Sequence, residues 1–256
     1  MEIAEKQEGS SAKEQKSGEA PLPSCTTALS QREHSAPASR GRICRAERLG
    51  LVDYSKALSI QQQAVEHLRS GEVTERLFLL EHPHVFTLGR GADGTNILAD
   101  EAHLKSLSVE VHETGRGGDV TYHGPGQLVG YPILNLKPDR CDVHRYVRDI
   151  EEVLIRTIAD FGIAGGRVNG LTGVWVRDEK VAAIGVRIAR WITSHGFALN
   201  VNTDLAYFRL IVPCGITNKG VTSIARLLGR AVDMEEVMRS VTMHFAEVFA
   251  RDMKTD

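Results

Sequence analysis

The sequence predicts an α+β fold with a mixed β-sheet and packed helices, preceded by a disordered tail. Apolar runs typical of strands and amphipathic segments typical of helices are interspersed, but they do not alternate strictly as in a doubly wound parallel sheet. Two helices are clear from their apolar stripes, one over 142–161 and one beginning near Asp233. No comparable period occurs before Asp53.

The other elements are predicted from local periodicity and from turn residues. A helix is expected from Asp53, its N-cap, to about residue 70, with Leu58, Val65 and Leu68 on its apolar face. Pro132 lies inside a long apolar segment and indicates an edge strand or a bulge there. Strands are expected at 76–80, 109–111, 127–136, 174–176, 181–188 and 197–201.

Residues 1–48 are predicted to form a disordered N-terminal extension, and residues 49–254 one domain. The extension is rich in Ser, Glu, Lys, Ala and Gln, and the first aromatic residue of the chain is Tyr54. Such a segment cannot bury enough apolar surface to offset an ordering cost of about 1–2 kcal/mol per residue. It lacks the apolar core of a secretory signal and the acid-poor composition of a mitochondrial presequence. We expect it to be a dispensable extension or the product of an upstream start codon.

Composition excludes several classes of function. The 256 residues carry 31 Lys and Arg against 33 Asp and Glu, a net charge of −2, so no global field favours nucleic acid. No apolar run reaches the roughly 18–20 residues of a membrane span. Cys25, Cys44, Cys141 and Cys214 form no CxxC pair, and without a secretory signal they predict no disulfide framework. We therefore expect a cytoplasmic protein that binds neither nucleic acid nor membranes. We also expect a monomer, although composition does not determine the oligomeric state.

The most unusual stretch is the glycine-rich segment 115–127. Its glycines allow a backbone to approach a ligand closely, and successive N–H groups can receive an anion or a carbonyl oxygen. No Lys-Ser or Lys-Thr follows, which excludes a P-loop, and the third position of a GxGxxG pattern is Val120. The segment is either a structural hairpin or a substrate-binding loop. Arg116 and His123, which bracket the glycines, favour the loop.

The histidines do not predict a metal site. His82, His84, His123 and His195 are scattered, and no HExxH or CxxC motif accompanies them. Dispersed histidines are more often hydrogen-bonded packing residues than ligands. We expect no bound metal.

Cys214 and Lys180 are candidates for nucleophilic chemistry. Pro213 and Gly215 flank Cys214 and favour a thiol exposed at a turn over a buried one. A nucleophilic cysteine needs its pKa lowered from about 8.5 by a cation or a base. Lys180, at the start of an apolar strand, can fill this role. From the residues alone, an inert packing cysteine and a solubilising strand-edge lysine remain open.

Several motifs together resemble the lipoyl(octanoyl) transferase family. The segment 116–132, RGGDVTYHGPGQLVGYP, is similar to the family signature, and 82–90, HPHVFTLGR, resembles its HPxVxTxGR element. GVWV at 173–176 with Lys180 and IGVR at 184–187, HGFALNVN at 195–202 and PCGI at 213–216 follow in the family's order. The resemblance extends from about residue 50 to residue 250. Two positions depart from the common pattern, Ala183 in place of Ser and Phe197 in place of Leu.

This resemblance implies an ATP-independent acyltransferase with the α+β catalytic domain of biotin and lipoate ligases. The octanoyl or lipoyl group would pass from octanoyl-acyl carrier protein to a lysine of a lipoyl domain, the first step of lipoate attachment and biosynthesis. By position, Cys214 matches the nucleophile that forms the acyl thioester, and Lys180 matches the acid/base that lowers the thiol pKa. The substrate-binding positions implied are Arg116, Gly117, Gly118, Asp119, Val120, Thr121, Tyr122, His123, Ala183, Ile184, Gly185, Gly196, Phe197 and Ala198.

The resemblance also implies partners and cofactors. The donor would be octanoyl-acyl carrier protein, and the acceptors the lipoyl domains of 2-oxoacid dehydrogenase E2 subunits and the glycine cleavage H protein. No cofactor is expected beyond the phosphopantetheine of the carrier protein, which delivers the acyl group. Two alternatives stay open: an ATP-dependent lipoate or biotin ligase on the same fold, and a non-catalytic module that binds the carrier protein. Acyl transfer without ATP, through a thioester on Cys214, separates both from the transferase.

Overall fold

A computed structural model describes residues 42–255 except 73, 93 and 213–218. The predicted extension therefore lies outside the described residues up to position 41. The rest of it, 42–48, belongs to strand β1, so the predicted boundary at residue 48 was wrong. In β1 the buried side chains are the small Cys44 and Ala46, which are separated by Arg45, preceded by the exposed Ile43 and followed by Glu47. Because the buried face carries only these two small residues, the strand shows little apolar period in the sequence.

The secondary structure is mixed, as predicted. The helices are α1 (Tyr54–Arg69), α2 (Glu101–Ser106), α3 (Val143–Asp160), α4 (Ile224–Leu228) and α5 (Met234–Phe249), with two 3₁₀ turns, η1 (Gly94–Asn96) and η2 (Leu205–Leu210). The strands are β1 (Arg42–Leu51), β2 (Glu75–Glu81), β3 (Val85–Leu88), β4 (Glu110–Glu113), β5 (Val120–His123), β6 (Gln127–Ile133), β7 (Gly166–Val168), β8 (Leu171–Val176), β9 (Glu179–Ala189), β10 (Ile192–Asn200), β11 (Gly220–Val221) and β12 (Arg251–Thr255).

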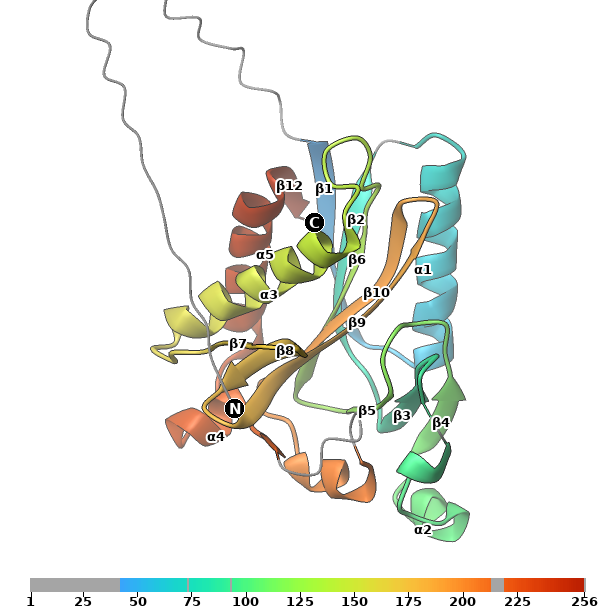
Figure 1. Cartoon of the computed structure of the whole chain (residues 1–256), viewed down its shortest axis with the longest axis vertical. Coiled ribbons are helices and arrows are strands. Elements are labelled where there is room, and N and C mark those ends of the chain that lie inside the picture. Colours follow the sequence, from blue (N-terminus) through green and yellow to red (C-terminus); the bar gives the residue numbers. More distant parts are fainter. Residues whose placement is uncertain (1–41, 73, 93, 213–218, 256) are drawn as a thin grey trace, which may run out of the picture. The chain divides into compact units, whose positions relative to one another are not determined.

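A large mixed sheet forms the centre of the fold (Figure 1). Its strand order is β12-β1-β2-β6-β10-β9-β8-β7, and β11 pairs in parallel with β9. β1 is parallel to both of its neighbours, whereas the ladders from β2 to β7 are antiparallel. A second sheet of order β4-β3-β5 lies beside η2 and α2 and shares an apolar cluster with them.

Helices cover both faces of the large sheet. α3 and α5 pack on one face, over the main core, and α1 packs on the other against β2, β6 and β10 (Figure 1). The Asp142 and Asp233 side chains cap α3 and α5 by accepting hydrogen bonds from backbone N–H groups. Asp53 makes no such side-chain bond to α1. The buried face of α1 consists of Tyr54, Ala57, Gln61, Ala64 and Leu68, and it is centred on smaller residues than predicted.

Pro132 lies in the interior strand β6, contrary to the expected edge or bulge. The ladder between β6 and β10 ends at Gly130, so Pro132 interrupts no hydrogen bond on that side. Beyond that point the Thr193 hydroxyl donates a hydrogen bond of 2.7 Å to the Pro132 carbonyl oxygen. A proline is tolerated here because its missing N–H has no partner to lose.

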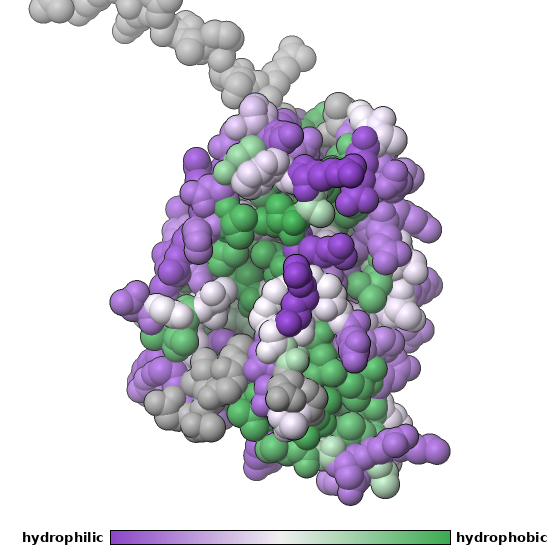
Figure 2. Space-filling model, turned by 45° about the vertical axis from the view of Figure 1, so that its right-hand side comes forward, coloured by the Kyte–Doolittle hydropathy of each residue, from purple (hydrophilic) through white to green (hydrophobic). Residues whose placement is uncertain are grey.

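The surface is mixed in character. Figure 2 shows a face on which apolar residues gather in broad areas with hydrophilic side chains between and around them. Among residues 42–255, outside the gaps, the exposed large apolar side chains are Ile43, Leu51, Leu98, Val111, Val143 and Met243. No helix in the described part of the chain is long and apolar enough to cross a membrane.

Candidate functional site

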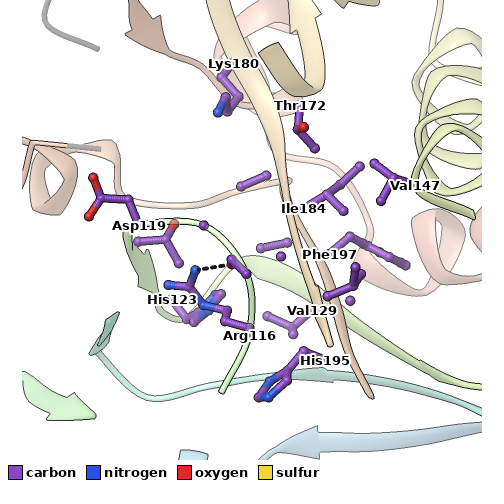
Figure 3. Close-up of a pocket in the computed structure, with 18 of the residues that line it drawn as sticks. Arg116, Asp119, His123, Val129, Val147, Thr172, Lys180, Ile184, His195 and Phe197 are labelled. Carbon is purple, nitrogen blue, oxygen red and sulfur yellow. Dashed lines mark hydrogen bonds between the residues drawn. The ribbon is translucent and has the colours of Figure 1, made fainter. Parts of the chain in front are cut away.

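A cavity of about 530 Å³ lies where the glycine-rich loop 115–119 meets strands β5, β6, β9 and β10. The start of β8 and the first turns of α3 also contribute to its lining. Figure 3 shows side chains from these separate elements converging on it. Fourteen of the predicted site residues line it: Arg116, Gly117, Gly118, Asp119, Val120, Thr121, His123, Lys180, Ala183, Ile184, Gly185, Gly196, Phe197 and Ala198.

Two predicted site residues are not part of this lining. Cys214 lies outside the described residues. Tyr122 is fully buried, and its side chain packs with Phe86 and Phe208 in the cluster of the small sheet. Its hydroxyl is 2.8 Å from Nδ1 of His84. Because side chains alternate along a strand, Tyr122 points away from the side on which His123 lines the cavity.

A gap in the large sheet gives the cavity access to the backbone of β9. The ladder between β8 and β9 ends at Ala182, and the next partner on that edge is the N–H of Gly117, which donates to the Val186 carbonyl at 2.9 Å. Residues 183–185 lie between these two attachments and line the cavity. A methyl group on Gly185 would lie 3.0 Å from the Gly117 carbonyl oxygen, so the loop approaches this strand closely because position 185 is glycine.

The loop is held by the side chain of Arg116, which is 7% exposed. Its Nη2 donates to the Thr87 carbonyl oxygen at 2.6 Å, and its Nε donates to the Thr87 hydroxyl at 3.2 Å. The backbone N–H groups of Arg90 and Gly91 donate to the carbonyls of Arg116 and Gly118 at 2.9 and 3.0 Å. A guanidinium used in this way fixes the loop against β3 and the turn that follows.

A chain of buried amides extends from His123 toward Lys180. Gln127 donates through Nε2 to Oδ1 of Asn200 at 2.9 Å, so its Oε1 accepts from Nδ1–H of His123 at 2.7 Å. Asn200 Nδ2 in turn donates to the Thr222 carbonyl at 2.9 Å, and the Thr222 N–H donates to the Lys180 carbonyl at 3.0 Å. These bonds connect the glycine-rich loop to the strand that bears Lys180.

The histidine side chains and the Tyr54 hydroxyl in the lining are uncharged at neutral pH. Burial lowers the pKa of His123 to about 3 and the pKa of His195 to about 4, with His82 and Arg116, respectively, adding to the effect. Burial also raises the pKa of Tyr54 to about 12. These side chains therefore provide neutral hydrogen-bonding groups and apolar ring surface.

Tyr54, His82 and Tyr131 form part of the site that the sequence analysis did not identify. Tyr131 donates from its hydroxyl to Nε2 of His82 at 2.7 Å, and His82 donates from Nδ1 to the Val52 carbonyl at 2.6 Å. Tyr54 and Tyr131 line the cavity, and His82 lies behind them. The nearest signal was the HPH motif at 82–84, which was considered as a possible metal site and as part of the family-like segment 82–90, but not as part of a substrate site.

Lys180 lies near the start of β9 with its ammonium nitrogen 4.8 Å from the centroid of the Trp175 ring. β9 has one extra residue, Val181, in its pairing with β8, so that Lys180 lies opposite Trp175. Such a bulge redirects the side chains next to it. The described chain resumes after the gap at Lys219, whose Nζ is 5.9 Å from the same ring.

Asp119 is the one carboxylate among the described residues that line the cavity. It accepts a hydrogen bond of 3.0 Å from Nδ2 of Asn96 and one of 2.6 Å from the backbone N–H of Val120. Within the described ranges no group of three or more His, Cys, Asp or Glu could hold a metal ion. The absence of a metal or a cofactor stays a prediction.

Comparison with known proteins shows what the chain is similar to. Residues 53–246 match the family described as the lipoyl protein ligase A/B catalytic domain. The chain is 53% identical over 212 residues to an octanoyltransferase of Solibacter usitatus, covering 83% of this chain and 96% of that protein. Its structure is similar to a bipartite lipoate protein ligase from Thermoplasma acidophilum, with a TM-score of 0.65, 19% identity and coverage of 85% and 86%. For a biotin protein ligase from Aquifex aeolicus the TM-score is 0.51, with 12% identity and coverage of 80% and 70%. The predicted α+β class, with a mixed sheet and packed helices as in these ligases, is confirmed for the described residues.

Proposed function

Since the chain belongs to the lipoyl protein ligase A/B catalytic domain family, we propose that it transfers an octanoyl group from acyl carrier protein to a lysine of lipoyl domains. The observation that carries this proposal is the 53% identity to an octanoyltransferase over 83% of the chain. Lys180 and thirteen of the predicted substrate-binding residues line one cavity, which supports it. The acceptors we propose are E2 lipoyl domains and the glycine cleavage H protein, with the reaction taking place in the cytoplasm.

The reaction we propose proceeds in two steps through Cys214. In the first, the Cys214 thiolate attacks the octanoyl carbonyl carbon. The bond from that carbon to the phosphopantetheine sulfur breaks, and the departing thiolate takes a proton from Lys180. In the second, the acceptor amine attacks the enzyme thioester, Lys180 takes the proton that the amine loses, and the Cys214 thiolate leaves. A thioester is exchanged for an amide, so no ATP is consumed.

The cavity suits the acyl group in two respects. Its lining contains strand backbone, glycines and aliphatic side chains, and the buried histidines in it are neutral. An eight-carbon chain buried there gains about 0.8 kcal/mol for each CH₂ group, or roughly 5 kcal/mol. A reaction between a thioester and an amine needs no phosphate-binding loop, and the glycine-rich segment does not have the sequence of one.

The experiment is octanoyl transfer from octanoyl-carrier protein to a purified lipoyl domain with ATP omitted. We expect transfer, and an enzyme adduct of about 126 Da in intact mass spectra when the acceptor is left out. Cys214→Ser should remove both the adduct and the transfer, whereas Cys44→Ser, a buried cysteine of the core, should retain them. Lys180→Ala should leave the protein folded and nearly inactive. Strict dependence on ATP would assign the chain to the ligases instead.

A further inference from the structure

The aliphatic part of Lys180 rests on strand β8. A methyl group built on Gly173 would be in van der Waals contact with Lys180, 3.4 Å from Cε and 3.5 Å from Cδ, so the lysine passes about one methyl group away from this glycine. Two residues further along the same strand, the Trp175 ring lies 4.8 Å from the Lys180 ammonium. Gly173 and the Trp175 ring therefore both lie beside the Lys180 side chain.

Gly173 occupies a backbone conformation that other residues rarely adopt. Its φ is +121°, and a methyl group there would lie 2.6 Å from the Ala182 carbonyl oxygen. The regular β8–β9 ladder begins only at Val174, so it does not hold the N–H of Gly173. The N–H of Gly173 therefore needs a hydrogen-bond partner outside this ladder.

Glu151 of α3 provides the missing partner. Its Oε1 accepts the hydrogen bond of Gly173 N–H at 3.0 Å. Its Oε2 accepts from Nη1 of Arg148 at 2.6 Å and from Nε of Arg167 at 3.0 Å. The side chain is fully buried, and a carboxylate in such a place is stable only when charges and hydrogen bonds compensate it. Two arginines satisfy one oxygen and the strand satisfies the other.

We propose that Glu151 is a positioning residue for Lys180, acting through the backbone of Gly173. α3 lies alongside β7 and β8 (Figure 1), so the carboxylate ties the helix to the strand on which the lysine rests. Lys180 projects from β9 at the cavity, near Thr172 at the start of β8 (Figure 3). This inference rests on the proposed function, in which Lys180 exchanges protons with the thiol and the acceptor amine.

The test is Glu151→Gln, which keeps the size of the side chain. Arg148 and Arg167 both donate hydrogen bonds, so the amide oxygen will turn toward them and the NH₂ group will face Gly173 N–H, donor against donor. The bond to the strand is then lost. We expect kcat for octanoyl transfer to fall roughly 10- to 100-fold, the cost of a misplacement of about 1 Å, with the KM for octanoyl-carrier protein unchanged.

Glu152→Gln is the matched control. Glu152 is the next residue of α3 and also binds Arg167, at 2.9 Å, but it makes no bond to Gly173. The same chemical change there should leave kcat unaltered. Glu151→Asp is a second variant, because it keeps the charge for the arginines while withdrawing the carboxylate from Gly173 by one CH₂ group. It should lower kcat in the same direction.

A second readout follows Lys180 itself. The rate of acetylation by an amine-reactive ester is measured at Lys180 by peptide mass spectrometry, with the exposed Lys254 as internal reference. In Glu151→Gln the relative rate at Lys180 should rise about threefold, as the side chain leaves its support, and in Glu152→Gln it should not change.

The two hypotheses fail in different ways. Equal kcat and equal Lys180 labelling in the two variants, or a loss of activity that merely follows the loss of folded protein, would overturn the positioning role. Absence of octanoyl transfer in the unaltered protein would overturn the proposed function, while the labelling ratio would still decide the role of Glu151.

Discussion

Acidification from pH 7 to pH 5 should destabilise this protein through three buried histidines. The pKa of His82 is lowered to about 4, that of His123 to about 3 and that of His195 to about 4, in each case chiefly by burial. In the unfolded chain a histidine titrates near 6.5. As the pH falls, the folded state therefore binds these protons at a lower pH than the unfolded state does.

The difference in pKa between the folded and unfolded states determines the sign and size of the change in the free energy of unfolding. Between pH 6.5 and about 4 the unfolded state carries more protons, so the free energy of unfolding decreases as the pH is lowered. Above pH 6.5 the contribution of each histidine is fully present. At pH 5 the contribution of each histidine to the free energy of unfolding is about 2 kcal/mol smaller than at pH 7. The three together lower it by about 6 kcal/mol, a large part of the 5–15 kcal/mol that is typical of a domain.

Urea unfolding at pH 7, 6 and 5 measures this effect. The control is His195→Asn, chosen because His195 has a φ of +56° that asparagine tolerates and because asparagine does not titrate. This variant should lose about 2 kcal/mol less between pH 7 and pH 5 than the parent does. A free energy of unfolding that is flat over this range, or an identical slope in the variant, would refute the assignment of neutral buried histidines.

Three further outcomes follow from the buried polar groups and the core. Tyr131→Phe removes the donor to His82 Nε2 and leaves a buried acceptor unpaired, so denaturant unfolding should show a loss of about 1–3 kcal/mol. Glu75→Ala leaves the nearly fully buried Arg251 without the carboxylate that its Nε contacts at 2.6 Å, and the same assay should show a loss of about 3–5 kcal/mol. Cys44 is fully buried, which raises its thiol pKa, so it should resist iodoacetamide in the folded protein and react in 8 M urea, about the concentration that unfolds most domains.

The elements with a strong apolar period were predictable from the sequence, and those built on weak local signals were not. The helix predicted over 142–161 is α3, Val143–Asp160, because a long stripe of large apolar residues marks it. Residues 42–48 of β1 were assigned to the tail because the buried residues of this strand are small and its partners, β2 and β12, are distant in the sequence. Only pairing with those strands gives the segment 42–51 a reason to be extended, and no local pattern encodes such pairing.

The same distinction holds within the site. Residues with an unusual local context, such as the glycines around Arg116, could be found from the sequence. Tyr54 and Tyr131 could not, because each belongs to a helix or strand whose pattern explains an aromatic residue by packing alone. In the sequence, Glu151 is simply one of two adjacent acidic residues in a predicted helix. Its contact with Gly173, 22 positions away, exists only in the folded chain.

The distribution of charge within the cavity accords with a reaction whose substrate tail is apolar and whose chemistry occurs at one point. The charged side chains that line it, Arg116, Asp119 and Lys180, belong to the loop and to the start of β9, and the buried histidines remain neutral. A charge deep in the lining would lose its hydration when an alkyl chain bound against it, and the alkyl chain offers no hydrogen bonds to compensate that desolvation penalty. A lysine that exchanges protons needs instead a fixed position, because proton transfer requires donor and acceptor within about 3 Å. The bulge at Val181, the indole of Trp175 and the tie from α3 to β8 all restrict where that lysine can be. In the proposed reaction, the position of the Lys180 ammonium group therefore matters more than the number of charges in the cavity.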